Sequence, residues 1–331
     1  MEHFEDNAGL RWFKHQLADY LGMAAALAAL IIIFSLITEN FFSLLTFRTI
    51  ANQIPSAIIV AVGMTFVLIM AEIDLSVGSV LAFSGAVLGI ALVKWNLPLP
   101  LAILLCLVAG GLSGLFNGFV VTRWGVPSFI VTLGMLEAAR GAAYLVTSSQ
   151  TIYIGASIER VSEIGLFGLT LPFLLAFIIV IAGQFFLTYS VPGRHLLAIG
   201  SNEDAARLAG INIRSVKIIV FSLTGILVAL ASIIQCSRLS AADPNAGAGF
   251  ELQAIAAVVI GGTSLTGGRG SVIRTFFGVL IIAVLGAGLA QAGAQEPVKR
   301  LITGLVIVAA VILDKYRQRM RNKNSWANKL S

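Results

Sequence analysis

Long apolar runs separated by short polar stretches fill most of the chain. A helix needs about 20 mostly apolar residues to cross the hydrocarbon core of a bilayer. The runs predict ten transmembrane helices, at about residues 21–38, 54–70, 77–93, 98–121, 126–146, 166–188, 216–236, 250–264, 272–292 and 299–313. The eighth run is short and could instead be re-entrant. The pattern predicts an all-α polytopic membrane protein.

Composition agrees with this interpretation. Of the 331 residues, 58% are hydrophobic and 11% are charged, whereas soluble domains carry about 25% charged residues. Cys106 and Cys236 lie inside apolar runs and show no metal-ligand spacing, so we interpret both as small apolar residues. Residues 1–20 lack the basic region and cleavage site of a signal peptide. They predict either an interfacial amphipathic helix or a cytoplasmic extension of the first span.

The distribution of basic residues predicts the orientation. With ten crossings both termini share one side, and fifteen of the 22 lysines and arginines then fall on that side. Cytoplasmic loops carry an excess of these residues, so both termini are predicted to be cytoplasmic, and no nucleic-acid partner is needed to explain the positive charge. The chain then divides into an N-terminal cytoplasmic or interfacial segment (1–20), a transmembrane domain (21–314) that includes a cytoplasmic loop (190–215), and a basic cytoplasmic tail (315–331).

That cytoplasmic loop contains a short helix with its own end signals, in the stretch GSNEDAARLAGI. Ser201 and Asp204 fit an S-x-x-D capping box, and Gly210 fits a C-terminal glycine. The residues EDAARLA between the caps allow barely two turns, and isolated helices under about 12 residues are marginal in water. The helix is therefore expected to need a packing partner, with an ordinary connector as the alternative.

Five blocks resemble the membrane subunit, or permease, of ATP-binding-cassette importers for monosaccharides, the ribose-permease-like family. They are IDLSVGSVLAFSGAV (73–87), NGFVVTRWGVPSFIVTLGM (117–135), ARGAAYLVT (139–147), GRHLLAIGSNEDAARLAGINIRSVKIIVFSLTG (193–225) and IAAVVIGGTSLTGGRGS (255–271). The blocks occur in family order, and the resemblance runs from about Ile50 to Asp314. In relatives the two residues before the first block are commonly glycines, whereas here they are Ala71 and Glu72.

The resemblance implies a role for the capped helix. In these importers a short cytoplasmic helix of the permease fits a cleft on the ATPase subunit, and closure of the ATPase pair moves the membrane helices. The matching residues here are Asn202, Glu203, Asp204, Ala205, Ala206, Leu208, Ala209 and Gly210. The pattern GxxxxGK[ST] does not occur in this chain, so ATP and Mg²⁺ are expected on partner ATPase subunits, with no cofactor bound here. The stretch GGTSLTGGRGS is expected to form a flexible cytoplasmic turn.

Charged residues inside spans are rare and usually face a bundle interior. Glu72 and Asp74 either line the substrate path or, in the case of Asp74 together with Ser76, cap span three. Glu137 and Arg140 stand three apart in span five and predict a structural ion pair, with a gate beside the pathway as the alternative.

Uncharged polar and small residues also stand out. Asn117 and Thr132 suit interhelical hydrogen bonds or contact with a sugar. Glycines at 110, 111, 114 and 118 allow close helix packing, within one subunit or across a dimer seam.

The resemblance further implies partners: a second permease subunit, expected to form a homodimer, the ATPase subunits, and a periplasmic sugar-binding protein on the outer face. Arg238, Asp243 and Glu251 in the outer loop are candidates for docking, with solvated loop charges as the alternative. The expected function is import of a monosaccharide (a ribose-like pentose, a hexose or a related polyol) across the bacterial inner membrane by a subunit that is not itself an enzyme. The alternatives are a branched-chain amino-acid-type permease and a gradient-driven secondary transporter, which would carry a clearer buried acidic relay.

Overall fold

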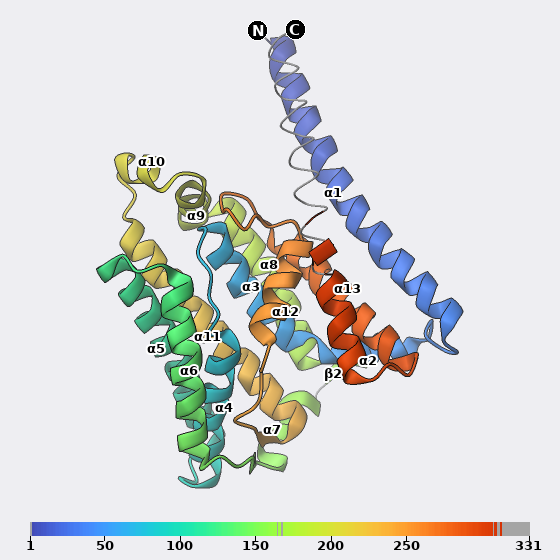
Figure 1. The fold of residues 1–331 in the computed structure, drawn as a ribbon, viewed down its shortest axis with the longest axis vertical. Helices are drawn as coiled ribbons and strands as arrows, with labels where there is room; N and C mark the ends of the chain where they lie inside the picture. The colour runs from blue at the N-terminus through green and yellow to red at the C-terminus, as the bar shows by residue number, and fades with distance from the viewer. Residues whose placement is uncertain (1, 164, 167, 307, 310–311, 313–331) are drawn as a thin grey trace. The chain divides into compact units, whose positions relative to one another are not determined.

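The protein is mostly helical in the computed structural model, which describes residues 2–163, 165–166, 168–306, 308–309 and 312 (Figure 1). The helices are α1 (Glu2–Ile37), α2 (Leu44–Gln53), α3 (Pro55–Ile69), α4 (Val77–Val93), α5 (Leu99–Trp124), α6 (Ser128–Thr147), α7 (Ala156–Glu163), α8 (Leu171–Tyr189), α9 (Val191–Ser201), α10 (Glu203–Leu208), α11 (Ile213–Leu239), α12 (Phe250–Ile260) and α13 (Val272–Gln291). Antiparallel pairing joins β1 (Ile152–Tyr153) to β4 (Ala241–Ala242) and β2 (Gly165–Leu166) to β3 (Leu169–Thr170).

Each of the first nine predicted runs coincides with a helix, but the helices differ in length. Within the described part of the chain, six helices are long and apolar enough to cross a membrane, or seven if the pair α2–α3, bent by 50°, is counted as one span. α4 and α12 are apolar but shorter, with 17 and 11 residues. Of the tenth run, the part up to residue 306 is helical. Most of the rest of that run, and the predicted tail 315–331, lie outside the described residues.

The chain forms two compact units, one of residues 1–50 with 280–331 and the other of residues 51–279. In the first unit, α1 continues unbroken to Ile37, which favours an extension of the first span over a separate surface helix. Phe34 packs against Gly288, and Gln291 donates a hydrogen bond of 3.0 Å to the hydroxyl of Thr46. The candidate site lies in the second unit.

Glycines of α5 let α11 lie directly against it. A β carbon at Gly114 would stand 2.1 Å from the carbonyl oxygen of Phe221, and one at Gly110 would stand 2.4 Å from that of Gly225. Gly118 meets the next turn of α11 in the same way. The four-residue spacing of small residues therefore serves packing within one subunit, since a larger residue would force the two backbones apart.

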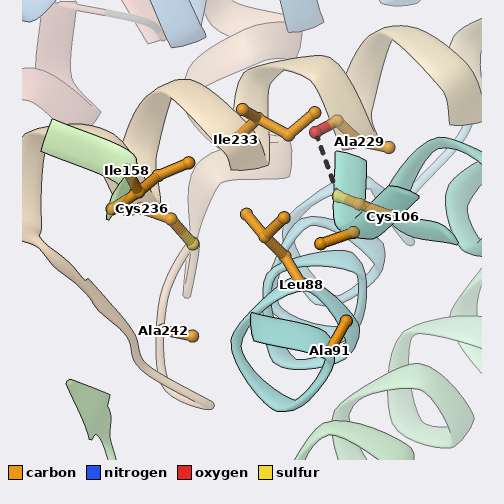
Figure 2. Close-up of a cluster of buried hydrophobic side chains, with 9 residues drawn as sticks. Leu88, Ala91, Cys106, Ile158, Ala229, Ile233, Cys236 and Ala242 are labelled. Atoms are coloured by element: carbon orange, nitrogen blue, oxygen red, sulfur yellow. Dashed lines mark hydrogen bonds between the residues drawn. The ribbon is translucent and has the colours of Figure 1, made fainter. Parts of the chain in front are cut away.

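The end of this unit that carries β1 and β4 has a core of small and branched side chains (Figure 2). Its buried members are Leu88, Ala91, Ala102, Cys106, Ile158, Ala229, Ile233, Cys236 and Ala242. The thiol of Cys106 lies 3.6 Å from the carbonyl oxygen of Ala229, and both cysteines are free and buried. Both therefore pack as the small apolar residues that the sequence predicted.

Candidate functional site

Two segments of the second unit consist of a short helix preceded by a stretch without helix. Residues 70–76, here called the first break, precede α4, and residues 243–249, the second break, precede α12. The first break follows the end of α3, and the second follows β4 at the opposite end of the unit. The starts of the two short helices meet, since a β carbon at Gly78 would lie 2.2 Å from the carbonyl oxygen of Gly247. Non-helical backbone at membrane depth must find hydrogen-bond partners within the protein.

The first break finds its partners on α6. Ser128 accepts a hydrogen bond from the backbone N–H of Ile73 at 3.0 Å, and Thr132 accepts one from that of Leu75 at 3.0 Å. The hydroxyl of Thr132 also lies 3.2 Å from the carbonyl oxygen of Ile73. Thr132 is fully buried, so it supports the break and does not face an open channel in this subunit.

The polar residues that follow form a buried chain. The carboxylate of Asp74 accepts hydrogen bonds from the backbone N–H of Ser76 at 2.8 Å and from its hydroxyl at 2.6 Å. The amide of Asn117 donates to the same hydroxyl at 3.0 Å. Ser76 occupies the N-cap position of α4, but its side chain caps no helix N–H. Ser76 therefore does not cap α4 with its side chain, whereas Asp74 does accept the free N–H of Ser76 at the N-cap position.

The second break is also held by α6. The guanidinium of Arg140 donates to the carbonyl oxygens of Pro244 at 2.5 Å and Ala246 at 2.9 Å, and the hydroxyl of Tyr144 donates to the side chain of Asn245 at 2.7 Å. The predicted ion pair between Arg140 and Glu137 was wrong. Among the described residues no ion pair joins them, since the carbonyls of the break attract the guanidinium.

The α6 residues that hold the two breaks are two pairs with four-residue spacing, Ser128 with Thr132 and Arg140 with Tyr144, and the pairs are eight residues apart. Residues four apart share one helix face. Our sequence analysis identified Thr132 and Arg140 but missed Ser128 and Tyr144. The signal that could have found them is that each lies four residues from an identified polar residue in an apolar span.

The short helix α10 differs in detail from its prediction. Its N-cap is Asn202, whose side chain accepts the backbone N–H of Ala205 at 2.9 Å. Ser201 instead donates to the carbonyl of Leu197, so the proposed Ser201–Asp204 capping box was wrong. Gly210 follows the C-cap with a φ of +81°, as expected for a glycine that ends a helix.

The side chains of α10 point in different directions. Ala206 is only 4% exposed and packs inward, whereas Leu208 is 90% exposed. Asp204, Ala205 and Ala209 are exposed as well. The free face of the helix is therefore small and partly apolar, with Leu208 as its largest side chain.

Glu203 joins α10 to the first break through a lysine of α11. The amine of Lys217 lies 2.8 Å from a carboxylate oxygen of Glu203 and 2.6 Å from one of Glu72. Glu72 is thus paired with a cation and is not the free pathway carboxylate that the sequence left possible. The guanidinium of Arg207 lies 3.3 Å from the carboxylate of Glu203, on the exposed surface of α10. These residues border a cleft of about 580 Å³ between α10, the start of α11 and the turn after α5.

The glycine-rich turn after α12 packs against the same end of the unit. Gly268 donates its N–H to the carbonyl of Ile69 at 2.9 Å, and a β carbon at Gly200 would stand 1.7 Å from that oxygen. Gly267 packs against Ala71. The structure therefore has a hydrogen-bonded turn wedged between α3 and α9 where a flexible turn was predicted.

The three residues predicted to dock a binding protein differ in exposure and in hydrogen bonding. Arg238 is exposed in the last turn of α11, and Asp243 accepts the N–H of Asn245 in a local turn. The carboxylate of Glu251 points inward, because a β carbon at Gly78 would lie 2.5 Å from it. Glu251 is therefore poorly placed for docking another protein, and its negative charge lies beside the positive end of α4.

Comparison with known proteins gives one family. Residues 46–311 match the family model described as branched-chain amino acid transport system / permease component. The ribose import permease of Escherichia coli K12 is 39% identical over 317 residues, which cover 94% of this chain and 98% of that protein. The ribose import permease of Bacillus subtilis is 38% identical, with 89% and 92% covered. The L-arabinose ABC transporter permease of Azospirillum brasilense is 35% identical, with 92% and 90% covered.

Proposed function

We propose, since the chain belongs to the permease family whose model matches residues 46–311, that it is the membrane subunit of an ATP-binding-cassette importer for a monosaccharide. The observation that carries this proposal is the similarity to ribose and L-arabinose permeases over more than nine-tenths of the chain. As a permease component it moves solute and is not itself an enzyme. ATP and Mg²⁺ belong to the partner ATPase subunits.

A pentose such as ribose is the first substrate to test. The family description names branched-chain amino acids, which keeps an amino acid as the second candidate. The relatives named for ribose and L-arabinose favour a sugar. Uptake of radiolabelled ribose, L-arabinose, xylose and leucine by cells expressing the complete transporter separates these candidates. Saturable uptake of a pentose but not of leucine is expected.

The free face of α10 is the proposed contact with the ATPase. Its support is geometric: Asn202 caps the helix, Gly210 ends it, and the large side chain of Leu208 projects away from the subunit. Ala206 belongs to the packing of this helix and not to its docking surface. A short, capped element with one projecting apolar side chain suits insertion into a cleft on a partner.

Ten crossings with both termini in the cytoplasm remain our proposed topology. In it, α4 and α12 cross the membrane together with the breaks that precede them, which supports counting both as spans despite their length. α10 and Arg214 then face the cytoplasm, and Tyr153 faces the outside. A thiol-specific, membrane-impermeant reagent added to whole cells should label Tyr153→Cys, which lies outside, and not Leu208→Cys, which lies in the cytoplasm. The native cysteines are buried and should give little background labelling.

The pathway is proposed to run along the exposed face of α6, between this permease and a second copy. Glu137 is exposed in the middle of this span, and β carbons at Gly134 and Gly141 would meet nothing within 4 Å in the subunit. A carboxylate near the bilayer centre costs about 2.5–3.5 kcal/mol on insertion scales, so this face is unsuited to lipid. A binding protein would dock on the outer side, where Arg238 and Asp243 remain candidates.

A further inference from the structure

Three charged side chains from separate segments meet at the end of the unit that carries α10. Lys217 comes from the first turns of α11, Glu203 begins α10, and Glu72 lies in the break before α4. The side chains of Lys217 and Glu72 are 10% and 12% exposed, and that of Glu203 is 40% exposed. One lysine therefore bonds both carboxylates in a largely enclosed place.

Enclosure makes this connection stiff. Removing one partner of a buried ion pair is strongly destabilising, because it leaves an uncompensated charge away from water. The bond between Lys217 and Glu72 is therefore costly to open, and the bond between Lys217 and the partly exposed Glu203 links it to α10. Exposed pairs such as Arg207–Glu203 resist displacement far less.

Glu72 is the last residue before the backbone that α6 holds. Ile73 follows it directly and is bonded to Ser128, and Asp74 begins the polar chain that reaches Asn117. A displacement of Glu72 must therefore act on a segment whose backbone and side chains are both fixed to membrane helices. The break is where such a displacement would alter polar groups deep in the subunit.

We propose that Lys217 is a positioning residue that fastens α10 to the break before α4, so that movement of α10 displaces the polar segment at Glu72 and Asp74. The proposal rests on the ATPase-coupling role proposed above for α10. A second contact, the backbone of Gly200 against Ile69, joins α9 to the end of α3. In this arrangement the lysine connects α10 itself, and the backbone contact connects the helix before it.

The connection can be measured without ATP or sugar. Hydrogen–deuterium exchange on the purified full-length permease should show faster exchange of peptides covering residues 70–76 and 202–209 in Lys217→Met than in wild type. If Lys217→Met folds poorly, the double variant Lys217→Met/Glu72→Gln replaces it in the test. This double variant lacks the unpaired buried carboxylate that Lys217→Met alone would leave at Glu72. Lys299→Met, which removes an exposed ion pair with Glu296, is the matched control. Unchanged exchange in both segments would overturn the connection.

Transport then tests what the connection does. In proteoliposomes containing the complete transporter, radiolabelled ribose taken up per ATP hydrolysed should fall by about tenfold in Lys217→Met, while ATPase assembly and hydrolysis persist. Glu203→Gln and Glu72→Gln should each lower the same ratio, and Glu72→Gln should add little in the Lys217→Met background, as expected when two residues act through one contact. A ratio within about twofold of wild type in these variants would refute the positioning role. Absence of ATP-dependent uptake in wild type would instead refute the proposed function, and the exchange result would stand apart from it.

Discussion

Arg140 of α6 donates a hydrogen bond of 2.5 Å to the carbonyl oxygen of Pro244, 104 residues further along the chain. Through it, one helix secures the backbone of the break before α12, just as Thr132 secures the break before α4. A charged donor fits this place because Pro244 is buried, and a buried carbonyl group needs a hydrogen-bond partner within the protein. The relationship explains why an apolar span carries an arginine at all.

Replacing Arg140 by methionine should destabilise the permease, because two carbonyl groups would lose a charged donor. Hydrogen bonds to charged groups contribute about 1.5–3 kcal/mol each. We expect a fall of several degrees in the unfolding temperature in detergent, measured by loss of helical circular dichroism. The exposed Arg238→Met serves as the control. Equal unfolding temperatures for Arg140→Met and wild type would show that the break does not depend on this residue.

Leu208→Glu should abolish binding of the ATPase while the permease remains inserted. A carboxylate on the projecting side chain of α10 would have to be buried in the partner's cleft, at a cost of several kcal/mol. Co-purification of the ATPase with tagged permease measures this directly. Tyr153→Glu, an equally drastic change at an exposed residue 71% accessible near the other end of α11, should retain the ATPase. Retention of the ATPase by Leu208→Glu would remove α10 as the contact.

Gly114→Ala should be strongly destabilising, because its β carbon would stand 2.1 Å from the carbonyl oxygen of Phe221. Overpacking of this kind typically costs about 1–3 kcal/mol, and backbone atoms cannot move aside as a flexible side chain can. Gly286→Ala is the matched control, since a β carbon there meets nothing within 4 Å. Membrane abundance and thermal unfolding of the two variants should differ clearly. Similar values for both would contradict the close packing of α5 on α11.

A cysteine at Glu137 should react with a small water-soluble thiol reagent, and saturating substrate should slow the reaction. Water in the proposed pathway keeps the thiol ionisable, whereas lipid would protect it. Ile178→Cys, on the exposed apolar surface of α8, is the control and should stay unlabelled. If both cysteines were equally unreactive, the face of α6 around Glu137 would not line an aqueous path.

Ala71→Gly should stabilise the permease slightly. Ala71 has a φ of +61°, a left-handed conformation that costs a residue with a β carbon about 1–2 kcal/mol. The substitution also removes the methyl group of Ala71 that packs against Gly267, and this loss acts in the opposite direction. We expect an increase of a few degrees in the unfolding temperature. A decrease would show that the methyl group contributes more by packing than the backbone conformation costs.

The hydrophobic pattern predicted the helices well, because lipid selects strongly for apolar runs. The run 77–93 matches α4 at both ends, and the short eighth run is the short helix α12. The structure also bears on the two positions, Ala71 and Glu72, where this chain lacks the glycines common in relatives. Ala71 adopts a backbone conformation that glycine favours, and Glu72 forms an ion pair with Lys217.

The sequence could not predict which side chains bond to groups far away along the chain. Glu137 and Arg140 have the right spacing for an ion pair, yet carbonyls about a hundred residues away compete successfully for the guanidinium. Ser201 and Asn202 are both suitable caps, and only the geometry shows that the asparagine is used. The burial of Ala206 likewise depends on how α10 lies against α11, which six residues of sequence do not determine.

The most direct test of the central claim is to purify the tagged permease gently from its native membrane and identify what accompanies it. The account predicts an ATPase with P-loops, and uptake of radiolabelled ribose or another pentose that is lost when the P-loop lysine of that ATPase is replaced. A permease that purifies alone and moves solute without ATP would contradict the account.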